Sequence, residues 1–180
     1  MRIGVVVRSS DDLEMAEALE AVGVHDLWFG IDDPGGDPMV LAGAAAVTTR
    51  RVGLTVMLDE PTPVAAKAVA SLDALSAGRV RVVVSSEAGL SLLRSMLSPE
   101  STVPIRPAPV QQHVPVWTTA PDLADVADGV VVRQGSEPAG ATHVALVVND
   151  LESCDLVGVE EVVLSVGEGL WETVGKVLRD

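Results

Sequence analysis

The sequence predicts an α/β protein built as a reduced eight-stranded (β/α) barrel. Strand and helix patterns alternate from one end of the 180-residue chain to the other. Valine is dense and falls in short continuous runs, which is typical of parallel strands buried on both faces. Eight strands in one alternating series favour a closed TIM-type barrel over an open sheet.

The length of the chain limits this barrel. The 180 residues leave about 22 residues for each strand–helix unit, whereas barrels of this class usually need about 200 residues or more. Two sizeable cores do not fit in this length, so we treat residues 1–180 as one domain. An incomplete or distorted barrel is the alternative.

The first half of the chain supplies four strand–helix units. Apolar runs predict strands over residues 3–7, 26–29, 53–58 and 80–84. Ser9 or Ser10 is placed to cap the first helix, and Asp37 with Pro38 begins a second helix that covers Met39–Thr49. A further helix is expected over residues 90–97.

The helix that follows the third strand has the clearest boundaries. Thr62 is a suitable N-cap, Pro63 fits the first helical position, and Gly78 can end the helix in a left-handed conformation. Its predicted apolar stripe consists of Val64, Val69, Leu72 and Leu75.

Three polar residues at the end of this helix are interpreted as structural. Asp73 and Arg79 are placed to pair across the turn, with Ser76 between them. By itself this run indicates architecture and no chemistry.

The second half of the chain is less regular. Four prolines between Pro104 and Pro115 exclude a regular helix there. We expect strands over residues 116–119, 130–133, 144–148 and 161–166, and helices over residues 122–127, 151–156 and 170–178. Residues 135–142 are too rich in Gly and Pro for the helix that should follow the sixth strand.

Composition excludes several classes of partner. The net charge of −14 and the pI near 4.4 oppose binding to nucleic acid or to an anionic membrane. Aromatic residues make up only 2 %, so stacking platforms for bases are scarce. Cys154 is the single cysteine, and we find no signal-peptide pattern or membrane-spanning run, which favours a cytoplasmic protein.

Motifs in the order of a known family extend this interpretation. Residues 72–79, LDALSAGR, form the most specific of them, and weaker matches lie at residues 18–28, 37–48, 107–117, 127–129 and 157–164. Together these segments resemble the luciferase-like monooxygenase superfamily, which contains bacterial luciferase and flavin- and deazaflavin-dependent oxidoreductases. The resemblance implies a barrel, flavin mononucleotide or a deazaflavin coenzyme of the F420 type, and a small-molecule substrate.

The sequence departs from this family where the cofactor would bind. Family members are longer, and the insertion that usually follows the fourth strand is missing. Where the family shows Gly-x-Gly after that strand, this chain has Ser85 and Ser86. Where many deazaflavin enzymes carry Asp-His after the second strand, this chain has Ile31 and Asp32. The catalytic histidine of those enzymes has no counterpart.

The expected site lies at the carboxyl-terminal ends of the strands, as in other barrels. Hydroxyl and cationic groups there are suited to the phosphate of a flavin or deazaflavin. The candidate cofactor contacts are Arg8, Ser85, Ser86, Thr118 and Arg133. Asp32 is a weak candidate for a catalytic polar group near the ring.

Acidic residues at the same ends oppose a bound phosphate unless they point outward. We interpret them first as helix caps or solvated groups. A Mg²⁺- or Ca²⁺-type site formed by Asp32, Asp33, Asp59 and Glu87 is a weaker alternative, because their spacing is not specific. The histidines precede strands, at the wrong end for catalysis, and no zinc-type spacing occurs.

Two functions remain open at this point, so whether the chain is an enzyme is uncertain. The first is a flavin- or deazaflavin-dependent oxidoreductase or monooxygenase. The second is a non-catalytic barrel that has lost its cofactor site and serves as a binding or partner subunit. The Met39–Thr49 region is apolar nearly all round, and luciferase relatives dimerise in this region, so we expect a homodimer through it.

Overall fold

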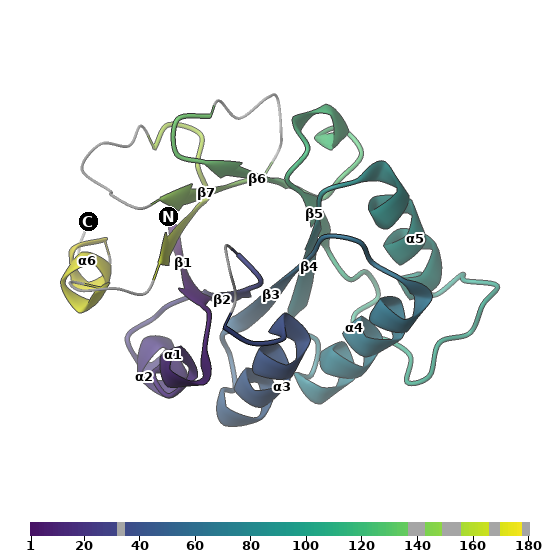
Figure 1. Cartoon of the computed structure of the whole chain (residues 1–180), viewed down its shortest axis with the longest axis horizontal. Helices are drawn as coiled ribbons and strands as arrows, with labels where there is room; N and C mark the ends of the chain where they lie inside the picture. The colour runs from purple at the N-terminus through teal and green to yellow at the C-terminus, as the bar shows by residue number, and fades with distance from the viewer. Residues whose placement is uncertain (32–34, 137–142, 149–155, 166–169, 178–180) are drawn as a thin grey trace.

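The eight predicted strands close into a parallel barrel. The computed structural model describes residues 1–31, 35–136, 143–148, 156–165 and 170–177. The strands pair in chain order around the ring, and β8 pairs with β1 (Figure 1). They are β1 Arg2–Val7, β2 Asp26–Phe29, β3 Gly53–Leu58, β4 Val80–Val84, β5 Val116–Thr118, β6 Val130–Arg133, β7 Val144–Val148 and β8 Glu161–Ser165. The barrel prediction is therefore confirmed, and the sheet is complete.

The helical layer is uneven around this ring. The described helices are α1 Ser10–Leu13, α2 Ala16–Ala21, α3 Pro38–Thr48, α4 Pro63–Leu75, α5 Glu87–Leu97 and α6 Leu170–Val177, with a 3-10 turn at Pro121–Leu123. Helices α1–α5 cover the β1–β5 side, and no α-helix is described beside β6 and β7 (Figure 1). The helix expected over residues 151–156 lies almost wholly outside the described residues. No described helix is both long enough and apolar enough to cross a lipid bilayer.

Alternation along the strands creates two apolar clusters. On β1, Val5 and Val7 pack outward against the helices, whereas Val6 points into the barrel. The outer cluster also contains Leu27 and Phe29 of β2. Each fully buried side chain of this size stabilises the fold by about 1.5–3 kcal/mol relative to an exposed one. Valine side chains are thus buried on both faces of the sheet.

The structure corrects details of the helix after β3. Thr62 caps α4 as predicted, accepting a hydrogen bond from Ala65 N at 3.2 Å. Gly78 has a φ of +83°, as its predicted role requires. Val64 and Leu75, however, are exposed. Because the buried face consists of Ala66, Val69, Ala70, Leu72 and Asp73, α4 packs closely on the barrel through small residues.

Asp73 and Arg79 do not pair with each other. The buried Asp73 carboxylate accepts hydrogen bonds from Val110 N at 2.7 Å and from both nitrogens of Gln111. Arg79 instead donates to carbonyl oxygens of the α3–β3 connection, including Val52 O at 2.7 Å. The motif therefore ties the proline-rich connector and the α3–β3 connection to α4.

Candidate functional site

A pocket opens at the carboxyl-terminal mouth of the barrel. Its volume is about 330 Å³, within the lower range of small-molecule sites. Ile31, Met57, Val131 and Val147 form apolar walls. Thr119, Arg133 and Ser136 add polar groups. Such an arrangement suits a flat, largely apolar ring system with one anionic or polar edge.

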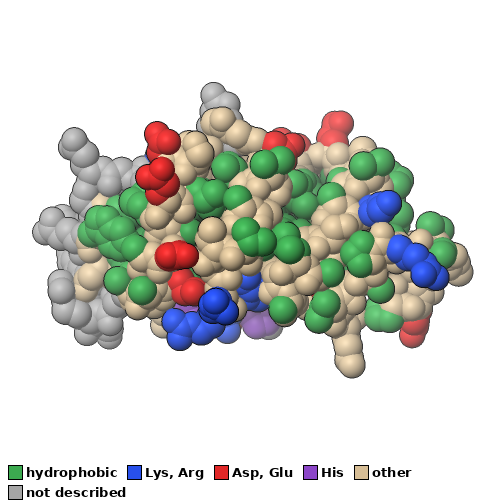
Figure 2. Space-filling model, turned by 90° about the horizontal axis from the view of Figure 1, so that it is seen from below, with side chains coloured by type: hydrophobic (Ala, Val, Ile, Leu, Met, Phe, Trp, Pro, Cys, Tyr) green, Lys and Arg blue, Asp and Glu red, His purple; other side chains and the backbone are tan. Residues whose placement is uncertain are grey.

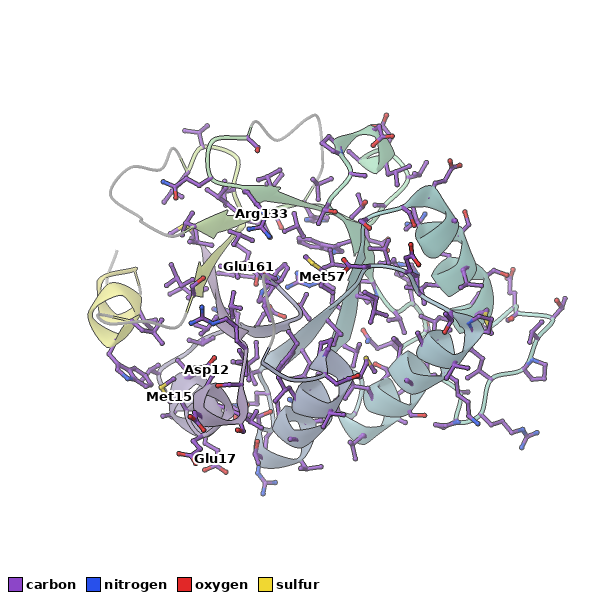
Figure 3. The ribbon with its side chains drawn as sticks, in the orientation of Figure 1. Asp12, Met15, Glu17, Met57, Arg133 and Glu161 are labelled. Carbon is purple, nitrogen blue, oxygen red and sulfur yellow. The ribbon has the colours of Figure 1, made fainter. Side chains whose placement is uncertain are left out.

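Strand ends place these side chains. Gly30, with a φ of +86°, turns the chain after β2 and brings the fully buried Ile31 to the interior. Arg133 is the last residue of β6 and Met57 lies near the end of β3. Figure 3 shows Arg133 and Met57 within the ring of strands, whereas Asp12, Met15 and Glu17 lie outside it.

Of the residues predicted to contact a cofactor, Arg133 lines this pocket. Thr118 is fully buried and its hydroxyl accepts a hydrogen bond from Ala120 N at 3.0 Å. Its neighbour Thr119 lines the pocket instead, because consecutive strand residues point to opposite faces. Asp32, the candidate catalytic group, lies outside the described residues.

The other three predicted contacts stand outside the pocket lining. Ser85 is exposed and donates to Asp59 O at 3.3 Å. Ser86 caps α5, and its hydroxyl accepts from Gly89 N. Arg8 lies at the end of β1, with its Nε 3.9 Å from the carboxylate of Asp12. The structure does not bring these three together with Arg133 in one lining.

Three acidic residues near this mouth stand outside the pocket lining. Asp59, Glu60 and Glu87 are exposed, and none of them lines the pocket. In the described part of the chain, no three His, Cys, Asp or Glu side chains gather as metal ligands. Arg133 is therefore the charged group that the described lining presents to a ligand.

At the opposite end the barrel interior is filled by a charged cluster. Arg81 of β4 is only 8 % exposed and donates from Nη2 to Glu161 Oε2 at 2.8 Å. The same nitrogen lies 3.2 Å from Asp26 Oδ1, and Nε donates to Thr55. Glu161 also accepts a hydrogen bond from Trp28 Nε1 at 2.8 Å. The cluster is thus hydrogen-bonded on several sides, as a buried charge requires.

Aromatic rings hold the guanidinium of Arg81 from both sides. Its central carbon lies 5.0 Å from the Trp28 ring centre and 4.2 Å from that of Trp117, within cation–π range. Gly4 makes room for this packing, because a Cβ there would lie 2.6 Å from a Glu161 carboxylate oxygen. A Cβ at Gly129 would lie 2.6 Å from the Trp117 ring.

Sequence similarity to a known family covers part of the chain. A family model described as luciferase-like monooxygenase matches residues 7–90, from the end of β1 into α5. The resemblance predicted from the motifs is confirmed over these residues, and the weaker motifs at residues 107–117, 127–129 and 157–164 lie outside the match. A comparison with curated protein sequences gave no match.

Solved structures share the barrel. The coenzyme F420-dependent tetrahydromethanopterin reductase from Methanopyrus kandleri is 15% identical, with a TM-score of 0.61 over 81% of this chain and 65% of that chain. The monooxygenase RslO1 from Streptomyces bottropensis is 18% identical, with a TM-score of 0.65 over 99% of this chain and 79% of that chain. Phosphoribosyl anthranilate isomerase from Thermus thermophilus is 14% identical, with a TM-score of 0.55 over 92% of this chain and 87% of that chain. The chain thus spans 65% of the length of the reductase, and identities this low show a shared fold alone.

The charged cluster gives this barrel a pH-dependent stability. Burial raises the pKa of Glu161 above 4.5; the nearby Asp26 adds to this rise and Arg81 opposes it. The folded protein therefore keeps this proton at pH values where the unfolded chain has lost it. The favourable contribution is full below about pH 4.5 and declines as pH rises through the folded pKa.

We expect Glu161→Gln to remove this decline in stability with rising pH. Urea unfolding of the wild type and of the variant between pH 4 and 8 measures the effect. The unfolding free energy of the wild type minus that of the variant should fall as pH rises above about 4.5. A difference that stays constant or grows with pH would contradict the raised pKa.

Sequence reasoning missed the cluster around Arg81. The available signal is an arginine at the second position of a valine-rich strand, since a charge in a buried strand needs a partner. Its partners come from β2 and β8, 55 and 80 residues away in the chain. Local patterns do not identify such distant partners.

Proposed function

We propose that this protein is a flavin- or deazaflavin-dependent oxidoreductase that acts on a small-molecule substrate, with the cofactor ring in the carboxyl-terminal pocket. The observation that carries the proposal is an apolar pocket with Arg133 in its lining and without Asp59, Glu60 or Glu87. The match of residues 7–90 to the luciferase-like monooxygenase family supports it, as do an F420-dependent reductase and a monooxygenase among the similar structures.

The residues of the pocket have distinct parts in this proposal. Ile31, Met57 and Val147 pack against the ring and exclude water. Arg133 binds an anionic edge or phosphate of the cofactor through charge-assisted hydrogen bonds. The hydroxyl of Thr119, in place of the predicted Thr118, is a second cofactor contact. A flavin or deazaflavin, when bound, supplies hydride transfer.

Three other groups at the mouth are proposed as outer contacts for the cofactor's polar tail. Ser85 and Ser86 stand at the amino end of α5, an 11-residue helix whose N–H groups favour an anion. Arg8 adds a cation at the end of β1. These contacts contribute less than Arg133 because they lie outside the pocket lining.

Arg133→Gln is expected to weaken cofactor binding by about 10-fold or more, because a hydrogen bond to a charged group contributes roughly 1.5–3 kcal/mol. Fluorescence titrations with flavin mononucleotide and with the deazaflavin coenzyme measure the dissociation constants. Arg50→Gln is the matched control, because Arg50 is exposed and lies on the α3–β3 connection. Absence of saturable binding at millimolar cofactor would favour the non-catalytic barrel instead.

We propose further that the protein forms a homodimer through α3. Val40 and Val47 are 69% and 67% exposed, and Val64 of the adjacent α4 is 77% exposed. Gly43, between the two α3 valines, has open space beside its Cα. Figure 2 shows a broad side of the molecule with many hydrophobic and uncharged side chains. A second copy packed there would remove these valines from water.

Val47→Glu is expected to shift the protein to monomers, because it places a charge in the proposed interface. Sedimentation velocity at micromolar concentration measures the association state. Val103→Glu is the control, since Val103 is exposed in the connector after α5. A wild-type monomer at micromolar concentration would rule out this dimer.

A further inference from the structure

A second pocket opens at the other end of the barrel, where the strands begin. Its volume is about 480 Å³, and its lining includes Arg2, Arg81, Trp117, His143 and Glu160. None of these residues lines the carboxyl-terminal pocket. Barrel enzymes place their chemistry at the carboxyl-terminal end, so this pocket is separate from the proposed cofactor site.

Arg81 lies between the charged cluster and this pocket. Its Nε donates to Thr55, and its Nη2 faces Glu161 and Asp26. Within the described residues Nη1 has no hydrogen-bond partner, although the side chain is nine-tenths buried. Nη1 is not fully buried, because the only described side-chain atom that is fully buried without a partner is Arg94 Nε. Since Arg81 lines the pocket, the N–H groups of Nη1 face it.

A column of flat groups fixes the direction of Arg81. The guanidinium lies between Trp28 and Trp117, and Trp117 stacks on His143 with ring centres 6.5 Å apart and planes 20° apart. A donor held in this way loses little side-chain entropy when a ligand binds. The pocket thus contains a preorganised cationic donor.

The carboxylates around the pocket already have partners. Asp128 accepts from Val116 N at 2.7 Å and contacts His113 Nε2 at 2.9 Å. Glu160 contacts His143 Nδ1 at 2.8 Å, and its side chain is 45% exposed, so its second oxygen can face water. Arg2 forms no ion pair in the described part of the chain. The unused hydrogen-bonding groups at the pocket therefore include two cationic donors.

The remaining walls indicate the rest of the ligand. Pro115 and Ala127 line the pocket beside Trp117 and offer apolar surface. The volume of about 480 Å³ exceeds what an inorganic anion fills, since a water molecule occupies roughly 30 Å³ in the liquid. We propose that this amino-terminal mouth binds a small organic carboxylate, whose carboxylate contacts Arg81 Nη1 and Arg2 while its apolar part packs against Pro115 and Ala127.

Benzoate is a direct probe of this site. Trp171 lies in α6, is 45% exposed and does not line this pocket, so a Trp171→Phe protein leaves Trp28 and Trp117 as fluorescence reporters. Titration at constant ionic strength should give a saturable change with benzoate and none with the neutral isostere benzamide. Arg2→Gln in this background should weaken benzoate at least 10-fold, whereas Arg50→Gln should leave the affinity unchanged.

Three outcomes would overturn the proposal: no saturation with benzoate, an equal response to benzamide, or an affinity that Arg2→Gln leaves intact. Loss of benzoate binding in Arg133→Gln alone would place the ligand at the other mouth and would also overturn it. Arg81→Lys should weaken binding too; if that variant does not fold, the exposed Arg2 still decides the result. The test requires no flavin or deazaflavin, so it is independent of the proposed function.

Discussion

Arg81→Met is expected to lower the free energy of unfolding by about 3–5 kcal/mol, because removing one partner of a buried ion pair leaves an uncompensated charge. Glu161 is 1% exposed and Arg81 donates to it at 2.8 Å. Asp26 would lose the same cation, which lies 3.2 Å away. The variant would also lose the cation between Trp28 and Trp117, worth roughly a further 0.5–2 kcal/mol.

Urea unfolding at neutral pH measures this loss, and a double variant separates charge from packing. Adding Glu161→Gln to Arg81→Met removes one buried negative charge, so the double variant should be more stable than Arg81→Met alone. Lower pH should also stabilise Arg81→Met relative to the wild type, because Glu161 then takes up a proton. A double variant no more stable than the single one would contradict the electrostatic explanation.

Asp73→Ala is expected to destabilise the protein by about 2–4 kcal/mol, because a buried carboxylate that accepts several hydrogen bonds is removed. The backbone nitrogens of Val110 and Gln111 would lose their acceptor, and so would the Gln111 side chain. This contact ties the proline-rich connector to α4, so the connector should exchange its amide hydrogens faster in the variant.

The unfolding free energy and amide exchange of the connector together test this role of Asp73. Asp125→Ala is the matched control, because Asp125 is exposed and its substitution should change stability by less than about 0.5 kcal/mol. Equal losses in the two variants would show that the hydrogen bonds of Asp73 do not stabilise the fold.

The barrel could be predicted from the sequence because its signals are local. Valine runs mark buried strands, and Ser9, Asp37 and Thr62 each cap a helix as their sequence positions indicate. Gly78 is required by its left-handed backbone. Such features depend on a few neighbouring residues, so they can be predicted without knowledge of the tertiary structure.

The site was harder to predict because it depends on direction and on distant partners. The sequence placed a threonine at the end of β5, yet the alternation of the strand decides that Thr119, and not Thr118, reaches the pocket. Asp73 and Arg79 are close in sequence, but each finds better partners in other loops. The pairing of Arg81 with Glu161 requires the closed ring itself.

Amide hydrogen exchange with and without saturating flavin mononucleotide, repeated with the deazaflavin coenzyme, tests whether the carboxyl-terminal pocket holds a cofactor. We expect one of the two cofactors to slow exchange in the segments around Ile31, Thr119 and Arg133, which meet at this pocket. We expect no comparable change around Arg2 and His143, which lie at the other mouth. No protection by either cofactor, or protection at the amino-terminal mouth alone, would contradict a cofactor site in the carboxyl-terminal pocket.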